Sequence, residues 1–167
     1  MAWDDASVST TNKTPSHNAM SNRIAHHEAD ITTLNATIPG ARILVVDDNE
    51  AIRKLHAAIL SFEGYEVEMA EDGADALEQL TTGQFDLVFT DRQMPILDGE
   101  RMVLALRSAG IRIPVMMISG SLAQSPLYAE VAREVSIALP KPIRARDLLA
   151  AIFTALHPLQ PNLRAAA

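Results

Sequence analysis

Cysteine is absent from the 167-residue sequence, and this absence excludes several kinds of site. A chain without thiols forms no disulfide, no thiolate zinc site and no cysteine nucleophile. The acidic start, Met1-Ala2-Trp3-Asp4-Asp5, leads into no long apolar run, so we expect no signal peptide, no transmembrane helix and no membrane partner. Together these features predict a cytoplasmic protein.

An excess of positive charge is also missing, because the formal net charge is -7. Affinity for nucleic acid depends on Lys and Arg that neutralise phosphates, so we expect no DNA partner. Aromatic residues make up only 4%, yet hydrophobic residues reach 48% and charged residues 21%, which is a normal globular balance. The length suits one domain with flanking sequence.

Large apolar residues are scarce in residues 1–40, which are rich in Ser, Thr, Asn and His. We therefore expect a flexible N-terminal extension there, a domain over 41–157 and a tail over 158–167. The tail is too short for an output domain, so output is expected to come from binding a partner. A short helix in the extension stays open, because apolar residues recur there near heptad spacing: Ile24, Ile31, Leu34 and Ile38.

From residue 42 onward, apolar patterns typical of strands alternate with patterns typical of helices. Five strand–helix units of this kind predict a parallel sheet that is covered on both faces. Right-handed crossovers favour a doubly wound α/β fold with strand order 2-1-3-4-5. The predicted strands are 43–46, 65–70, 87–90, 114–118 and 137–139, and the helices follow at Asp48-Asn49-Glu50, 74–80, Asp98, Ser125-Pro126 and Ala145.

Polar residues follow the predicted strands at the edge where such sheets bind ligands. Three of them, Asp47, Asp48 and Asp91, are carboxylates, and they are expected to meet Ser119 and Lys141 there. Carboxylates that converge in a partly dry site repel one another unless a cation joins them. Mg²⁺, or Mn²⁺, suits such oxygen ligands, and the set predicts phosphoryl chemistry with a carboxylate nucleophile.

Four segments at these strand ends together resemble the signature of response regulator receiver domains of the single-domain, chemotaxis-regulator-like kind. The resemblance covers about residues 41–157 and implies the flavodoxin-like receiver fold. Each segment alone is common by chance, but four in order, each at the end of a predicted strand, are specific. The segments are Val45-Val46-Asp47-Asp48, Thr90-Asp91-Arg92-Gln93-Met94-Pro95 with Asp98-Gly99, Ile118-Ser119-Gly120 and Leu139-Pro140-Lys141-Pro142.

The resemblance implies that Asp91 is the phosphoacceptor, which takes a phosphoryl group from a phosphohistidine. Ser119 would donate a hydrogen bond to one phosphoryl oxygen, and Lys141 would neutralise another. The bond before Pro142 is expected to be a cis peptide that aims the lysine.

For the metal, the resemblance implies direct contacts from Asp48, Asp91 and the backbone carbonyl of Gln93. Asp47 would hold the ion mainly through water. The ion would be Mg²⁺ or Mn²⁺, and no other cofactor is expected.

The implied partners are a histidine kinase or a histidine phosphotransfer protein, and a downstream protein target. The chain would promote only its own phosphorylation and dephosphorylation, so it is not expected to be an enzyme for other substrates. One departure stands out, since Ala138 occupies the place of the family's usual aromatic switch residue. Output is then expected through Tyr128 or a shift of the loop at Ser119.

Parts of the sequence are compatible with other functions. The chain could be a docking module that is never phosphorylated, or the receiver portion of a hybrid histidine kinase. A phosphohydrolase would need a second Asp where Gln93 stands, and a flavin mononucleotide site would need a neutral loop in place of residues 47–50. Asp47 and Asp48 could also simply cap a helix, and His56 is expected to pack in the core.

Overall fold

The computed structural model describes residues 38, 40–120 and 126–157, and of residue 128 only the backbone. All of these residues belong to one compact unit, Ala36–Ala167. The helix left open within residues 1–37, the tail 158–167 and the predicted helix cap Ser125 lie outside the described residues.

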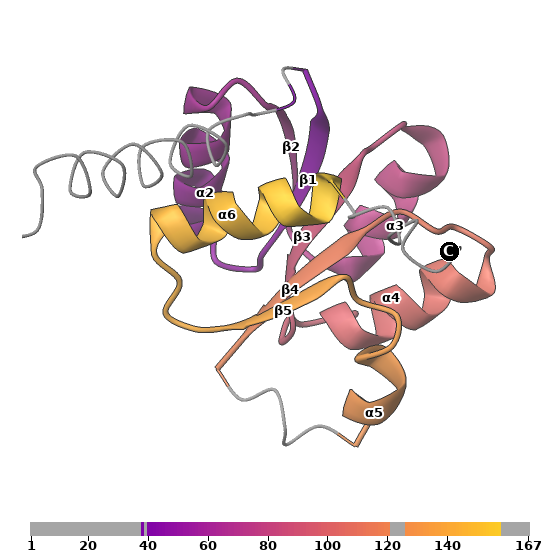
Figure 1. Ribbon diagram of the computed structural model, residues 1–167. Helices are drawn as coiled ribbons and strands as arrows, with labels where there is room; N and C mark the ends of the chain where they lie inside the picture. Colours follow the sequence, from indigo (N-terminus) through magenta and orange to yellow (C-terminus); the bar gives the residue numbers. More distant parts are fainter. Residues whose placement is uncertain (1–37, 39, 121–125, 158–167) are drawn as a thin grey trace, which may run out of the picture. The chain divides into compact units, whose positions relative to one another are not determined.

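A five-stranded parallel sheet forms the centre of the fold, and its order β2-β1-β3-β4-β5 is the predicted one (Figure 1). Three of the strands, β1, β3 and β4, contain apolar runs, and nearly every residue in them is buried because both faces of the sheet are covered. The strands are β1 (Arg42–Val46), β2 (Glu66–Ala70), β3 (Leu87–Asp91), β4 (Val115–Ser119) and β5 (Ile137–Pro140).

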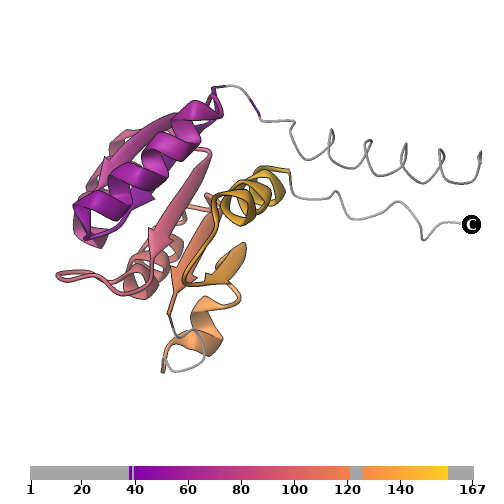
Figure 2. The same ribbon diagram turned by 90° about the vertical axis from the view of Figure 1, so that its left-hand side faces the viewer.

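Helices pack on both faces, with α2 and α6 on one face and α3, α4 and α5 on the other (Figures 1 and 2). Alternate residues of β1 enter two separate cores. Ile43 and Val45 pack on the face that contains Leu148, while Leu44 and Val46 pack on the opposite face. The helices are α2 (Glu50–Phe62), α3 (Gly73–Thr82), α4 (Gly99–Ser108), α5 (Tyr128–Val131) and α6 (Ala145–Leu156).

The ends of α2 and α4 carry a capping residue and glycines that the sequence predicts. Asp98 caps α4, since its side chain accepts a hydrogen bond from the Arg101 backbone N–H at 2.8 Å. Gly64 and Gly110 follow α2 and α4 with φ of 90° and 78°, left-handed values that glycine adopts without strain. No helix in the described ranges has the length and apolar character needed to span a bilayer.

One helix is shorter than predicted. The sequence suggested a start at Ser125-Pro126, but Pro126 and Leu127 form a turn, and α5 begins at Tyr128. The helix ends after Val131 because the hydrogen bonds that follow include tight three-residue closures, such as Glu134 N–H to Val131 O at 2.9 Å. The short helix leaves β5 as a partly covered edge strand.

Candidate functional site

The end of β1 places two carboxylates at the carboxyl edge of the sheet. Asp47 is buried and Asp48 is exposed. Neither caps the next helix, because that role falls to Asn49, whose side-chain oxygen accepts hydrogen bonds from the backbone N–H groups of Ala51 and Ile52 at 3.0 and 3.2 Å. The helix-cap reading of the aspartate pair is therefore wrong, and both carboxylates are left for the site.

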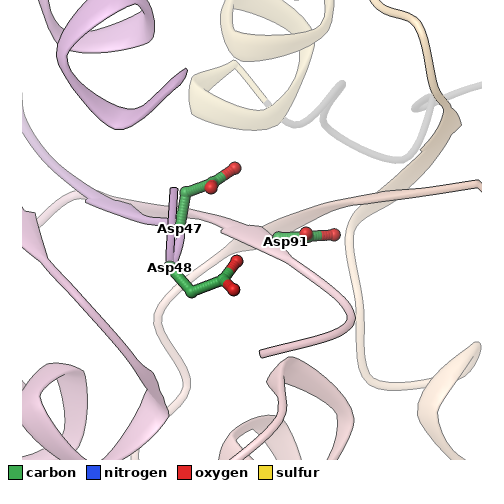
Figure 3. Close-up of side chains that lie close together, drawn as sticks. All are labelled: Asp47, Asp48 and Asp91. Carbon is green, nitrogen blue, oxygen red and sulfur yellow. The ribbon is translucent and has the colours of Figure 1, made fainter. Parts of the chain in front are cut away.

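Asp91, the last residue of β3, brings a third carboxylate to the same place (Figure 3). Oxygen atoms of Asp47, Asp48 and Asp91 all lie within 4.8 Å of one another. One carboxylate oxygen of Asp47, Oδ2, is buried and has no hydrogen-bond partner among the described residues. A buried, unpartnered carboxylate oxygen beside two other carboxylates fits a divalent cation with oxygen ligands.

Electrostatics at Asp47 support the same fit. Burial raises the pKa of the Asp47 carboxyl, and the nearby charges of Asp91 and Asp48 add to the rise. A hydrogen bond from the Asn49 backbone N–H and the charge of Lys141 act in the opposite direction. A cation bound among the carboxylates would favour the ionised form of Asp47.

Lys141 reaches the site from the end of β5. Its Nζ lies 2.6 Å from Asp91 Oδ2, so the lysine ammonium group is in direct contact with the predicted nucleophile. The Lys141 backbone N–H donates to the carbonyl of Ser119 at 2.9 Å, which joins the end of β5 to the end of β4. The predicted cis peptide between Lys141 and Pro142 is present.

Ser119 ends β4 and is buried, but its hydroxyl has a partner that the sequence did not reveal. Arg92 Nε donates a hydrogen bond to Ser119 Oγ at 2.7 Å. Arg92 is itself buried, and its Nη1 lies 3.8 Å from Glu100 Oε1, another buried group. A charged residue directly after a strand end is usually exposed, so only the close approach of α4 reveals this pair.

Gly99 allows that close approach. A Cβ atom at this position would lie 2.3 Å from the backbone oxygen of Asp91, which is far inside van der Waals contact. The Gly99 N–H also donates to the carbonyl of Arg92 at 2.8 Å, and the Thr90 hydroxyl donates to the Asp91 carbonyl at 2.7 Å. The backbone around the predicted phosphoacceptor is thus fixed from two sides.

The other residues that the sequence singled out are less constrained by the structure. Gln93 is exposed in the loop after β3, and the role of its carbonyl stays a prediction. Ala138 is exposed on β5, and the side chain of Tyr128 lies outside the described atoms. His56 is buried as predicted, with its ring edge-on to Phe89 and the centroids 5.0 Å apart.

Comparison with known proteins agrees with this geometry. The family model of the response regulator receiver domain matches residues 43–153. Curated relatives include "Response regulator MprA" of Mycobacterium sp. (strain KMS) and of Mycobacterium leprae (strain TN), each 37% identical over 121 residues. These matches cover 72% of this chain and 53% of each relative, so the chain spans about half the length of the curated relatives it matches.

Solved structures give the same result. A CheY-like response regulator receiver domain protein from Methanospirillum hungatei JF-1 is 29% identical with a TM-score of 0.64. The match covers 70% of this chain and 94% of that protein's chain. The Vibrio cholerae chemotaxis protein CheY4 is 30% identical with a TM-score of 0.63, with 70% and 98% covered. The chain therefore belongs to the response regulator receiver family of two-component signalling proteins.

Proposed function

We propose that Asp91 accepts a phosphoryl group from a phosphohistidine on a histidine kinase or a histidine phosphotransfer protein. The observation that carries the proposal is the position of this carboxylate. It lies within 4.8 Å of two further carboxylates and 2.6 Å from an ammonium group. A nucleophile between a cation site and a lysine is the arrangement that phosphoryl transfer requires, because the chemistry depends on positioning and on charge stabilisation.

In the proposed step a carboxylate oxygen of Asp91 attacks phosphorus in line with the phosphorus–nitrogen bond. That bond breaks, the imidazole leaves with its electron pair and keeps its proton on the other nitrogen, and an aspartyl phosphate remains. Lys141, already within reach of Asp91, neutralises charge on one phosphoryl oxygen. The Ser119 hydroxyl donates a hydrogen bond to another.

The proposed metal ligands are Asp48, Asp91 and the Gln93 carbonyl, with Asp47 acting mainly through water. The orphaned Oδ2 of Asp47 supports a cation here. When bound, Mg²⁺ or Mn²⁺ offsets the negative charge of the carboxylates and of the phosphoryl group. We propose no other substrate for this chemistry, so the chain would modify only itself.

An apolar hollow beside the site suits the phosphodonor protein. It measures about 370 Å³ and lies between α2 and the segment after β5, next to Lys141. Leu55, which lines the hollow, is 58% exposed, so the hollow offers apolar surface to a partner protein. We propose that the donor docks here, in the cytoplasm, and that a downstream protein then distinguishes the phosphorylated from the free form.

Intact-mass measurement after incubation with a small-molecule phosphodonor and Mg²⁺ tests the proposal. We expect one phosphoryl adduct on the wild-type chain and on Asp147→Asn, an exposed carboxylate on α6 that serves as the matched control. We expect no adduct on Asp91→Asn, and none when a chelator removes the metal. An unmodified wild-type chain that still binds Mg²⁺ would contradict the proposal and favour a docking module that is never phosphorylated.

A further inference from the structure

A buried ion pair involves Arg92, the residue that follows the predicted phosphoacceptor in the chain. The side chains of Arg92 and Glu100 are 8% and 9% exposed, and their charged groups lie 3.8 Å apart. Arg92 also donates from Nε to Ser119 Oγ at 2.7 Å. The Arg92 side chain thus connects the hydroxyl that is meant to contact a phosphoryl group with a carboxylate on α4.

The backbone of Arg92 is fixed by hydrogen bonds on both sides, so a change of position at this residue involves its side chain. Its backbone N–H donates to the carbonyl of Ile118 at 2.9 Å, and its carbonyl accepts from the Gly99 N–H at 2.8 Å. These two bonds fix the backbone to β4 on one side and to α4 on the other. Any response of Arg92 to events at Asp91 must therefore be a rotation of the side chain.

Phosphorylation would change the position of the hydroxyl that Arg92 holds, because Ser119 Oγ accepts from Arg92 and keeps its own proton to donate to a phosphoryl oxygen. In the proposed function Ser119 Oγ approaches an oxygen of the phosphoryl group on Asp91, while the rigid guanidinium of Arg92 fixes Oγ in its present place. A hydrogen bond that involves a charged donor resists this movement more strongly than a neutral one. Arg92 therefore favours the unphosphorylated arrangement of Ser119.

A second position for the guanidinium is already formed. A hollow of about 340 Å³ lies next to Arg92, and its charged lining also includes Asp98, Glu100 and Arg101. Asp98 already pairs with Arg101, whose Nε lies 3.6 Å from Asp98 Oδ2. A guanidinium that leaves Ser119 would keep Glu100 and share Asp98 with Arg101, so it would not become a buried, unpaired charge. The hollow adjoins the turn before α5, which places the rotated side chain at the surface between α4 and α5.

We propose that Arg92 is a two-position latch, by which we mean a side chain that pairs with Glu100 in both positions and contacts Ser119 in only one of them. In the free protein the latch holds Ser119, and in the phosphorylated protein it turns toward Asp98 and changes the surface between α4 and α5. The latch rests on the proposed function, since it acts through the contact between Ser119 and the phosphoryl group. It would supply a switch in a chain that has Ala138 where its family usually has an aromatic residue.

Affinity for beryllium fluoride, a phosphoryl mimic, in the presence of Mg²⁺ tests the latch on the full chain. The main variant is Arg92→Met with Glu100→Gln, which removes both charges of the pair together. We expect this variant to bind the mimic about tenfold more tightly than the wild type, because the charged donor that holds Ser119 Oγ in its present place is gone. Thermal unfolding of each variant confirms that it is folded.

A thermodynamic cycle with Ser119→Ala separates a latch from a general electrostatic effect. In the Ser119→Ala background the same double substitution should change the affinity less than about twofold, since the residue through which it acts is gone. Unchanged or weaker binding of the main variant overturns the latch, and so does a tightening that persists without Ser119. If the wild type itself fails to bind the mimic, the proposed function fails and the latch fails with it.

Discussion

Asp47 is a buried carboxylate whose pKa is raised by burial and by its acidic neighbours. An acid whose folded-state pKa is raised stabilises the fold when it is protonated, and it loses this contribution as the pH rises through the folded-state value. The loss begins near the ordinary aspartate pKa of about 4 and is complete above the raised one. At neutral pH the metal-free protein therefore carries an electrostatic penalty at this residue.

Asp47→Asn should remove that penalty. Without metal at pH 7 we expect the free energy of unfolding to rise by about 1 kcal/mol, the scale for a buried polar group that lacks partners. The variant should also lose most of the stabilisation that we expect Mg²⁺ to give the wild type. Thermal unfolding with and without Mg²⁺ measures both effects, with Asp147→Asn as the exposed control. A less stable metal-free variant with an intact Mg²⁺ response would show that Asp47 serves the fold and not a cation.

His56 makes a pH prediction of the opposite sign. Burial lowers its pKa, and the charge of Lys141 adds to this, while Asp91 acts against it. Stability should therefore fall as the pH drops below the unfolded value of about 6.5, because the unfolded chain takes up the proton first. The slope from this residue is at most about 1.4 kcal/mol per pH unit.

His56→Phe should flatten this part of the stability profile while it keeps the contact with Phe89. Denaturant unfolding between pH 7 and pH 5 is the measurement, and the exposed His157→Gln serves as control. Equal slopes for His56→Phe and the wild type would rule out a neutral, buried imidazole at this position.

Among the elements, α4 is placed by a single glycine. A Cβ at Gly99 would meet the Asp91 carbonyl oxygen at 2.3 Å, and this atom is backbone that cannot move aside cheaply. Gly99→Ala should therefore lower the free energy of unfolding by about 1–3 kcal/mol and slow phosphorylation of Asp91. Ser108→Ala, at the exposed end of the same helix, should change neither. A Gly99→Ala protein with wild-type stability and rate would mean that α4 can shift without consequence for the site.

Elements with strong local signals were predictable from the sequence. The apolar runs of β1, β3 and β4 gave the sheet, and the glycines after α2 and α4 marked where those helices end. The carboxylates followed because the carboxyl ends of parallel strands share one edge. The local sequence predicted two helix details less well. In α5 the last turn tightens after Val131, and in α2 the capping residue is Asn49 and not the aspartate pair.

Arg92 shows why the rest could not be read from the sequence. Its burial depends on the approach of α4, on the partner Glu100 eight positions later and on the hydroxyl of Ser119 in another strand. No periodicity encodes these three contacts, because they arise from tertiary packing. The sequence placed Ser119 and Asp91 at the right edge of the sheet but said nothing of what holds the hydroxyl.

At the scale of the whole molecule, one sheet with two cores brings residues from four strand ends to a single edge. Asp47 and Asp48 come from β1, Asp91 from β3, Ser119 from β4 and Lys141 from β5. The central claim is that this assembly makes one of its three clustered carboxylates, Asp91, the phosphoacceptor.

Borohydride trapping tests that claim most directly. Hydride reduces an aspartyl phosphate to homoserine as phosphate leaves, so peptide mass spectrometry of the phosphorylated, reduced chain names the modified residue. The account predicts homoserine at position 91, none at positions 47 or 48, and none without a divalent cation. Homoserine at Asp47 or Asp48, or phosphate that stays on a side chain other than an aspartate, would contradict it.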